Sequence, residues 1–499
     1  MDYVPTGTAN CPCTDDTCPT FIAQRRLQRL GPRASVAAAA DEQPDSPFLT
    51  QLANITLSDP HIRRSGAATM FIRHILEGKS TDNTDSDSDS ERKRHWEIPA
   101  MGIINIFAGI FQSHSEVQDA AILREIHSSY RGILEVIWKD FPSLSPAGPA
   151  GDSRRFVAAK MINFFLHNAE MKRSMYDEKT INLVLYCWLV TSPDSTVRIE
   201  VAHTVDVMFA ARDPFGNRPP PQYLQLAFKA YNIKTFVSQV NFSLKHKKML
   251  GQPLTREISV LCEFVRVNDP FVPHFLEAGV HRQVAAAVRR QLKNARAEDE
   301  SVTREVLEES GIFMQHLLQQ AKDTMAMFTD LLANTCMVEI GAAALKLANK
   351  SGSEEVPAWY EIFEKIKHSM TCKNFNGCEY HATPQFLRAA RTSLERVAIP
   401  TVIALQEEVV VGGERKYLVQ WMALGRVLGI TEESIRERYR TDRKCCNLGC
   451  PARNLGVQSS KKHTCTVCLS VFYCNRECQK SDWKTHKGEC ERLRQAAQG

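Results

Sequence analysis

Apolar side chains recur every three or four positions along most of this chain, which is the spacing of one face of an α-helix. Residues 115–142 show the pattern most plainly. Ser115 and Gln118 have the spacing of a capping box, so we predict a helix that begins there and ends before Pro142. A similar run predicts one long helix over residues 301–334. The apolar positions of the first helix are Val117, Ala120, Leu123, Ile126, Tyr130, Ile133, Ile137 and Phe141.

The same spacing predicts further helices between residues 47 and 440. Strand-like alternation is scarce, and Glu408–Val411 is the one candidate. Successive helices with short connections are typical of stacked helical arrays. Because no repeat of fixed period is present, we predict a mostly α fold whose helices form an irregular array resembling armadillo or HEAT proteins. The additional helices are predicted at about 153–174, 179–191, 196–211, 222–230, 254–267, 274–294, 357–370, 384–398 and 416–428.

Changes in composition divide the 499 residues into three parts. Residues 1–46 are rich in Ala, Pro, Thr and Asp without a sustained period, and we predict a disordered N-terminal tail. Residues 47–440 form the α-helical array, which is interrupted by a Ser/Asp-rich, solvated loop at 80–94. Residues 441–499 are predicted to fold as a separate small domain that ends in a helix.

Hydropathy and charge argue against several classes of protein. The longest apolar stretch, Pro99–Phe111, is shorter than the ~20 residues that span a bilayer, and the polar N-terminus lacks a signal-peptide pattern. We therefore expect an intracellular protein without a membrane partner, in the cytoplasm or the nucleus. The net charge of +5 is small for a chain of this length, which argues against nucleic acid as a partner.

The C-terminal segment carries potential metal ligands in four closely spaced groups. Eight of the sixteen cysteines lie between Cys445 and Cys490. In a reducing compartment such crowding indicates metal binding rather than disulfides. Zn²⁺ binds four nitrogen or sulfur donors in a tetrahedron, and a site closed by four protein donors is structural. The groups, which supply eight ligands for two such sites, are Cys445 or Cys446 with Cys450, Cys465 with Cys468, Cys474 with Cys478, and His486 with Cys490.

The segment from Tyr473 to Cys490 resembles the MYND family of zinc fingers, because it reads YC-x3-CQ-x2-DW-x2-H-x3-C. The family usually begins with C-x2-C, whereas this chain offers Cys446-x3-Cys450 or Cys445-x4-Cys450. We expect Cys446 to be the ligand and Cys445 to be a bystander. The resemblance implies two interleaved structural zinc sites, formed by Cys446, Cys450, Cys474 and Cys478 and by Cys465, Cys468, His486 and Cys490.

MYND fingers dock short proline-rich peptides, often of the P-x-L-x-P type, so the resemblance implies a peptide-binding groove. The residues that match this groove are Gln479, Trp483 and, more weakly, Thr466. An indole can stack on a proline ring, and an amide can bond to an extended backbone. The alternative for Trp483 is a structural plug over the zinc sites. The chain has its own P-x-L-x-P sequence, Pro142–Pro146, and we hypothesise that the finger binds it in cis or in another copy.

These observations favour a non-enzymatic adaptor that binds proteins through the array and the finger. No G-x-S-x-G, P-loop, H-E-x-x-H or dinucleotide-binding motif occurs in the sequence. The alternatives are a protein methyltransferase, since some SET-domain enzymes carry a MYND finger, and a regulator associated with nucleic acid. A long helical region followed by a C-terminal finger also resembles, by architecture, uncharacterised MYND proteins of basidiomycete fungi.

Overall fold

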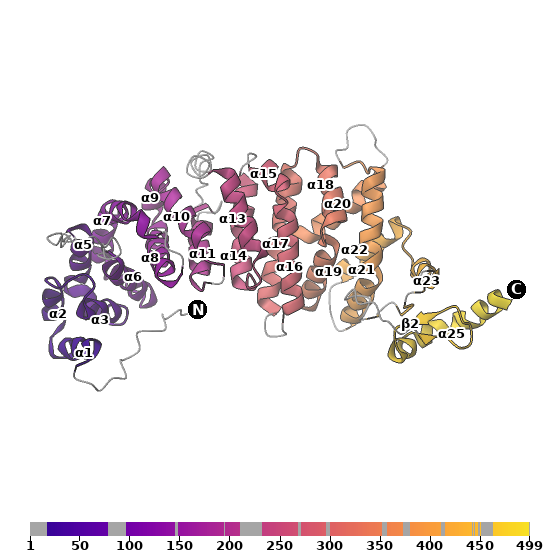
Figure 1. The fold of residues 1–499 in the computed structure, drawn as a ribbon, viewed down its shortest axis with the longest axis horizontal. Coiled ribbons are helices and arrows are strands. Elements are labelled where there is room, and N and C mark those ends of the chain that lie inside the picture. The colour runs from indigo at the N-terminus through magenta and orange to yellow at the C-terminus, as the bar shows by residue number, and fades with distance from the viewer. Residues whose placement is uncertain are drawn as a thin grey trace. The chain divides into compact units, whose positions relative to one another are not determined.

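The computed structural model shows a mostly α-helical chain with a small two-stranded sheet near its C-terminus, which confirms the predicted fold class (Figure 1). Contacts divide it into two compact units, Met1–Gln239 and Val240–Gly499. The structure describes residues 17–77, 96–144, 148–193, 195–209, 232–267, 271–295, 300–351, 357–372, 380–410, 415–441, 443, 445–447, 450 and 463–498.

The first unit consists of short helices stacked in two rows. Its elements are α1 (Pro19–Arg29), α2 (Pro32–Ala39), α3 (Pro47–Ile55), α4 (Pro60–Ile62), the π-helical turn η1 (Arg63–Ala67), α5 (Ala68–Glu77), α6 (Glu97–Gln112), α7 (Ala120–Lys139), the 3-10 turn η2 (Phe141–Leu144), α8 (Pro149–Leu166), α9 (Ala169–Ser174), α10 (Glu178–Val190) and α11 (Val197–Phe209). Helices α3, α6, α8 and α11 contact one another in succession, and so do α5, α7 and α10. Stacking of this kind is typical of helical repeat arrays.

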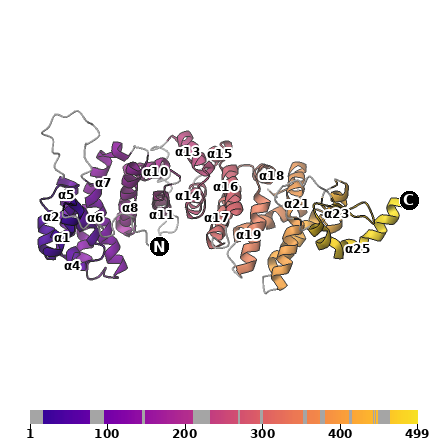
Figure 2. The same cartoon turned by 60° about the horizontal axis from the view of Figure 1, so that its bottom comes forward.

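The helices of the second unit are also stacked in two rows. Its helices are α13 (Ile233–Lys245, which begins in the first unit), α14 (Gln252–Val267), α15 (Phe271–Glu277), α16 (Val280–Asn294), α17 (Glu300–Gln320), α18 (Thr324–Asn334), α19 (Met337–Ser351), α20 (Pro357–Thr371), α21 (Pro384–Val410), α22 (Arg415–Val427), α23 (Glu432–Thr441) and α25 (Arg476–Gln498). Helices α14, α17, α20 and α22 contact one another in succession. Helices α16, α19 and α21 form a second row (Figure 2). Among the described residues no single helix combines the length and apolar character needed to cross a membrane, although α18 and Met337–Asn349 reach them together across an 82° bend.

The predicted disordered tail contains two helices where the structure describes it. Helices α1 and α2 each begin with a proline at the first helical position, where proline costs no backbone hydrogen bond. Several of their apolar side chains, among them Leu27 and Val36, are buried, and α1 packs on α3. The prolines therefore start helices here instead of preventing them. Residues 1–16 and the predicted Ser/Asp-rich loop at 80–94 lie outside the described residues.

Two helix boundaries differ from the predicted ones. Helix α7 begins at Ala120 rather than Ser115, because the Ser115 hydroxyl donates to the Asp119 carboxylate (2.6 Å) instead of capping a helix. The predicted helix over 301–334 is two helices, since the Asp323 carboxylate accepts from the Ala326 amide (2.8 Å) and starts α18.

The strand candidate Glu408–Val411 is also wrong over its described part. Helix α21 continues through Pro400 to Val410, well beyond the predicted end at residue 398. Proline removes one backbone hydrogen bond but does not always end a helix that is packed on its neighbours. Here α21 lies against α18, α19 and α22, which explains how the helix persists.

Trp359 of α20 fills the centre of the second unit. The side chain is fully buried, and its indole nitrogen donates to the Leu307 carbonyl (2.6 Å). Two helical glycines make room for it. A Cβ atom at Gly311 would lie 2.7 Å from the indole nitrogen, and one at Gly341 would lie 2.8 Å from the Trp359 ring and 2.7 Å from Phe363. These glycines allow α17 and α19 to approach α20 closely.

Alanine at either glycine should therefore destabilise the array. A Gly-to-Ala change inside a helix normally gains up to ~1 kcal/mol, but overpacking a filled core costs about 1–3 kcal/mol. We expect Gly311→Ala and Gly341→Ala to lower the free energy of unfolding, measured by urea denaturation. Gly488→Ala in α25 is the matched control, because a Cβ there meets no atom within 4 Å. Equal stability of Gly341→Ala and Gly488→Ala would contradict this description of the core.

Candidate metal centre

A short hairpin and one long helix build the C-terminal finger. Strands β1 (His463–Thr464) and β2 (Phe472–Tyr473) pair antiparallel, with His463 opposite Tyr473. The turn between them is closed by hydrogen bonds from the Cys465 amide to the Val471 carbonyl (2.9 Å) and from the Leu469 amide to the Cys465 carbonyl (3.0 Å). Helix α25 then begins where the Asn475 side chain accepts from the Cys478 amide (2.7 Å). The C-x2-C spacing thus places two thiols on one tight turn.

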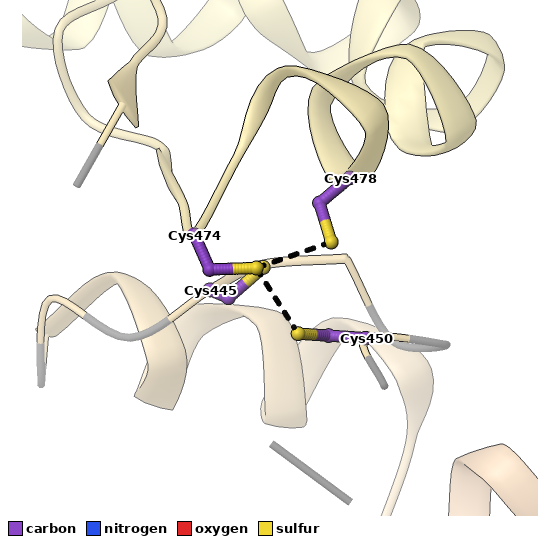
Figure 3. A group of neighbouring side chains, drawn as sticks. All are labelled: Cys445, Cys450, Cys474 and Cys478. Carbon is purple, nitrogen blue, oxygen red and sulfur yellow. Dashed lines mark hydrogen bonds between the residues drawn. The ribbon is translucent and has the colours of Figure 1, made fainter. Parts of the chain in front are cut away.

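The first group of ligands comes from two segments that are 24 residues apart in sequence. It consists of Cys445, Cys450, Cys474 and Cys478. Figure 3 shows these side chains pointing toward one another, with the Cys474 sulfur 3.4 Å from that of Cys450 and 3.3 Å from that of Cys478. All four sulfurs lie within 4.8 Å of one another. Zinc–sulfur bonds of about 2.3 Å in a tetrahedron require sulfurs about 3.8 Å apart, so the group has the size of a zinc site.

The second group joins the hairpin turn to α25. It consists of Cys465, Cys468, His486 and Cys490, all buried. The Cys465 and Cys490 sulfurs are 3.8 Å apart, and the Cys468 sulfur lies 3.6 Å from Nε2 of His486. Since α25 supplies ligands to both groups, the two sites are interleaved, as the resemblance implied.

The donor chemistry fits two structural zinc ions. Three thiols with an imidazole, and four thiols, are both typical of closed zinc sites. Burial raises the pKa of the Cys474 and Cys490 thiols to about 12, so without a cation these groups would stay protonated. A bound divalent ion lowers the pKa of these thiols, because it binds them as thiolates. Each site uses four protein donors, which leaves no position for a reacting water.

Cys445, rather than the predicted Cys446, lies with the other three thiols of the first group. The Cys446 amide donates to the Phe472 carbonyl (2.8 Å), and Cys445 forms a parallel bridge with the same residue. Neighbouring side chains of extended backbone point to opposite sides. Cys445 therefore faces the other three thiols, and Cys446 packs with Val471 and Tyr473 in the small core. The other seven predicted ligands all lie in the two groups.

Serine substitutions should show which of Cys445 and Cys446 binds zinc. Cys445→Ser removes one donor of the four-thiol site, so we expect the purified chain to hold fewer than two equivalents of zinc after dialysis against a mild chelator. Cys446→Ser keeps all eight donors and should retain both ions. Zinc content by elemental analysis gives the answer, and the reverse order would restore Cys446 as the ligand.

Helix α23 is attached to the finger by a buried ion pair that the sequence did not reveal. The Arg436 guanidinium donates to both carboxylate oxygens of Asp482, at 2.7 and 3.2 Å, and both side chains are buried. The Tyr473 hydroxyl donates to the same carboxylate (2.9 Å), and burial raises the pKa of this phenol. Arg440 adds a contact to Glu489 (3.4 Å). The folded finger therefore includes α23 as well as the zinc ligands.

The predicted groove residues lie at the surface of the finger. Trp483 is 42% exposed, with its ring 6.0 Å from that of His486, so it does not act as a buried plug. Gln479 is half-buried one helical turn earlier on α25, hence on the same side. Thr466 is exposed in the turn that carries Cys465 and Cys468.

The same turn exposes two apolar residues that the sequence analysis did not single out. Val467 is 50% and Leu469 is 68% exposed, and Leu469 has a positive φ of 56°. Their position in the sequence could have predicted this exposure, because a tight turn that carries zinc ligands offers apolar side chains little core in which to be buried.

The self-binding hypothesis for Pro142–Pro146 does not match the folded chain. Leu144, the central residue of the motif, ends the turn η2 and is fully buried. Its carbonyl accepts a hydrogen bond from the buried Arg155 guanidinium. Residues 145 and 146 lie outside the described residues. As folded, the segment does not offer its leucine to a groove.

Comparisons with known proteins identify the finger but not the array. Residues 445–490 match the MYND finger family, a zinc-binding protein-interaction domain. Two crystal structures of engineered proteins from a structural genomics consortium are similar to longer parts of the chain. One is 14% identical over 58% of this chain and 97% of its own, with a TM-score of 0.38. The other is 12% identical over 80% of this chain and 99% of its own, with a TM-score of 0.35.

Proposed function

We propose that the chain is a non-enzymatic adaptor whose finger docks short, extended, proline-containing segments of partner proteins. The observation that supports this most directly is the exposed indole of Trp483 beside the second zinc site. A large aromatic ring that is fixed in place and open to solvent loses little entropy when a ligand covers it. Aromatic residues of this kind are enriched among the dominant contacts of protein interfaces.

The zinc sites supply the rigidity that such a contact needs. Cys478, His486 and Cys490 tie the first, third and fourth turns of α25 to the two ions, and Trp483 lies between Cys478 and His486. Its indole face suits a proline ring, and the Gln479 amide, one turn away, suits the backbone of an extended peptide. The role of the metal is then structural, and binding specificity belongs to the side chains around it.

The closed geometry of the two sites supports binding rather than catalysis. A catalytic zinc keeps one position for water or substrate, whereas each site here has four protein donors. We expect no methyl transfer from S-adenosylmethionine to protein substrates by the purified chain. Transfer above the level of a chain denatured by heat would contradict the proposal and favour the methyltransferase alternative.

Peptide binding by the zinc-loaded full chain tests the proposed function. The probe is a fluorescein-labelled peptide with a P-x-L-x-P core and neutral flanks. Trp483→Ala should weaken its binding roughly thirtyfold, since truncating a dominant aromatic contact costs about 2 kcal/mol. Phe242→Ala is the matched control, because Phe242 is another exposed aromatic (62%) on α13. Equal binding by wild type and Trp483→Ala, with two zinc ions retained in both, would overturn the proposal.

A further inference from the structure

Three basic side chains share the face of α25 on which Trp483 lies. Arg476 lies seven residues before Trp483, Lys480 lies three residues before it, and Lys487 lies four residues after it. All three side chains are exposed. At about 100° per residue, these positions and Trp483 fall within a stripe roughly 60° wide. Lys480 and Lys487 are the neighbours of Trp483 along this stripe, at the i−3 and i+4 positions. We call these four residues the basic stripe.

The three cations of the basic stripe lack the acidic partners that several arginines of the finger have. Within the described part of the chain, no carboxylate pairs with Arg476, Lys480 or Lys487. By contrast, other arginines have acidic partners: Arg436 pairs with Asp482, Arg440 with Glu437 and Glu489, Arg492 with Glu433, and Arg494 with Glu491. The cations of the basic stripe, which lie on the helix face of the exposed indole, are therefore available to an anion of a partner.

The zinc sites limit what kind of anion this stripe attracts. Four thiolates around one Zn²⁺ leave a formal charge of −2, and three thiolates with an imidazole leave −1. These charges weaken the positive field at a distance, on which nucleic-acid binding depends. They cancel much less of the attraction at contact, where a carboxylate meets a lysine directly. The charge balance favours a short acidic peptide over a polyanion.

We infer that the preferred partner segment carries acidic residues on both sides of the apolar, proline-containing core that covers Trp483. The inference rests on the proposed function, and it narrows the partner from any proline-containing segment to one with acidic flanks. Arg476 and Lys487, the two ends of the basic stripe, are eleven residues apart on a helix, hence ~16 Å, which is about the length of five residues of extended peptide. Lys480 lies between them. Aspartate or glutamate directly next to a five-residue core, on either side, therefore meets a cation of the basic stripe.

Three labelled peptides test this inference on the zinc-loaded full chain. They share one P-x-L-x-P core and differ only in flanks of Glu, Gln or Lys. Two exposed ion pairs of ordinary strength should make the Glu-flanked peptide bind about tenfold more tightly than the Gln-flanked one at low salt. The difference should close at about 0.5 M NaCl, where exposed charges are screened. The Lys-flanked peptide should bind most weakly.

Charge variants connect the preference to named residues. Lys480→Gln with Lys487→Gln should abolish the gain from Glu flanks and leave the Gln-flanked peptide unaffected. The reversal Lys480→Glu with Lys487→Glu should make the Lys-flanked peptide the tightest of the three. Arg492→Gln is the matched control, since it removes an exposed cation from the opposite side of the same helix. It should retain the preference for Glu flanks.

The outcomes separate this inference from the proposed function. Trp483-dependent binding of the Gln-flanked peptide without any gain from Glu flanks would overturn the inference and leave the proposed function standing. If no peptide binds, the proposed function fails and the inference fails with it. An oligothymidylate that binds more tightly than the Glu-flanked peptide, through the same lysines, would assign the basic stripe to nucleic acid.

Discussion

Removing both zinc ions should unfold residues 463–498 and leave the helices of the array intact. The buried core of the finger consists of Val471, Tyr473 and six cysteines, five of which are metal ligands. This is too little apolar surface to offset the conformational entropy of ordering the segment. Zinc contributes on the order of 10–16 kcal/mol in small fingers, so its removal outweighs every other contact here. We therefore expect the largest single loss of structure in the chain.

Hydrogen exchange followed by mass spectrometry measures this loss segment by segment. Chelation should make peptides from α25 and the hairpin exchange within seconds, whereas those from α17 and α20 keep their protection. Adding zinc back should restore the original pattern. The same chelator applied to a chain that lacks zinc from the start is the control. Continued protection of α25 after both ions are removed would show that the segment folds without metal.

The sequence predicted the zinc ligands well because short spacings decide them locally. C-x2-C, C-x3-C and H-x3-C each place two donors on one turn or one helix face, whatever the rest of the chain does. The choice between Cys445 and Cys446 is different. It depends on which residue pairs its backbone with Phe472, a contact across 26 residues that no local spacing reports. Once that pairing is made, neighbouring side chains of the extended backbone point to opposite sides, and Cys445 is the one that faces the other three thiols.

The errors in the helical array have a similar origin. Apolar spacing predicted that residues 301–334 are helical, but it did not show the break at Asp323, where a side-chain cap interrupts the pattern without changing its period. It also ended the predicted helix at residue 398, although packing against three neighbouring helices carries α21 past Pro400 to Val410. Sequence periodicity reports that a segment is helical, whereas caps and tertiary contacts determine where each helix ends.

The buried ion pair between Arg436 and Asp482 could not be predicted from the sequence. It is the basis of the second large prediction. The two residues are 46 positions apart, and Asp482 belongs to the DW motif, where only Trp483 suggested a function. Arg436→Met removes the cation and leaves a buried carboxylate that still accepts a hydrogen bond from the Tyr473 hydroxyl. Breaking a buried pair in this way costs about 3–5 kcal/mol. We therefore expect apparent zinc affinity to fall by about two to four orders of magnitude, because zinc binding and folding are coupled.

Competition with a chromophoric chelator measures that affinity, and two variants control the interpretation. Arg492→Gln breaks the exposed pair with Glu433, which is worth at most about 1 kcal/mol, so zinc affinity should hardly change. Arg436→Met combined with Asp482→Asn removes both buried charges but keeps an acceptor for the Tyr473 hydroxyl. This double variant should recover much of the loss, since the penalty lies in the unpaired carboxylate rather than in the missing attraction. If the double variant is as weak as Arg436→Met alone, the loss comes from altered packing of α23 on the finger instead.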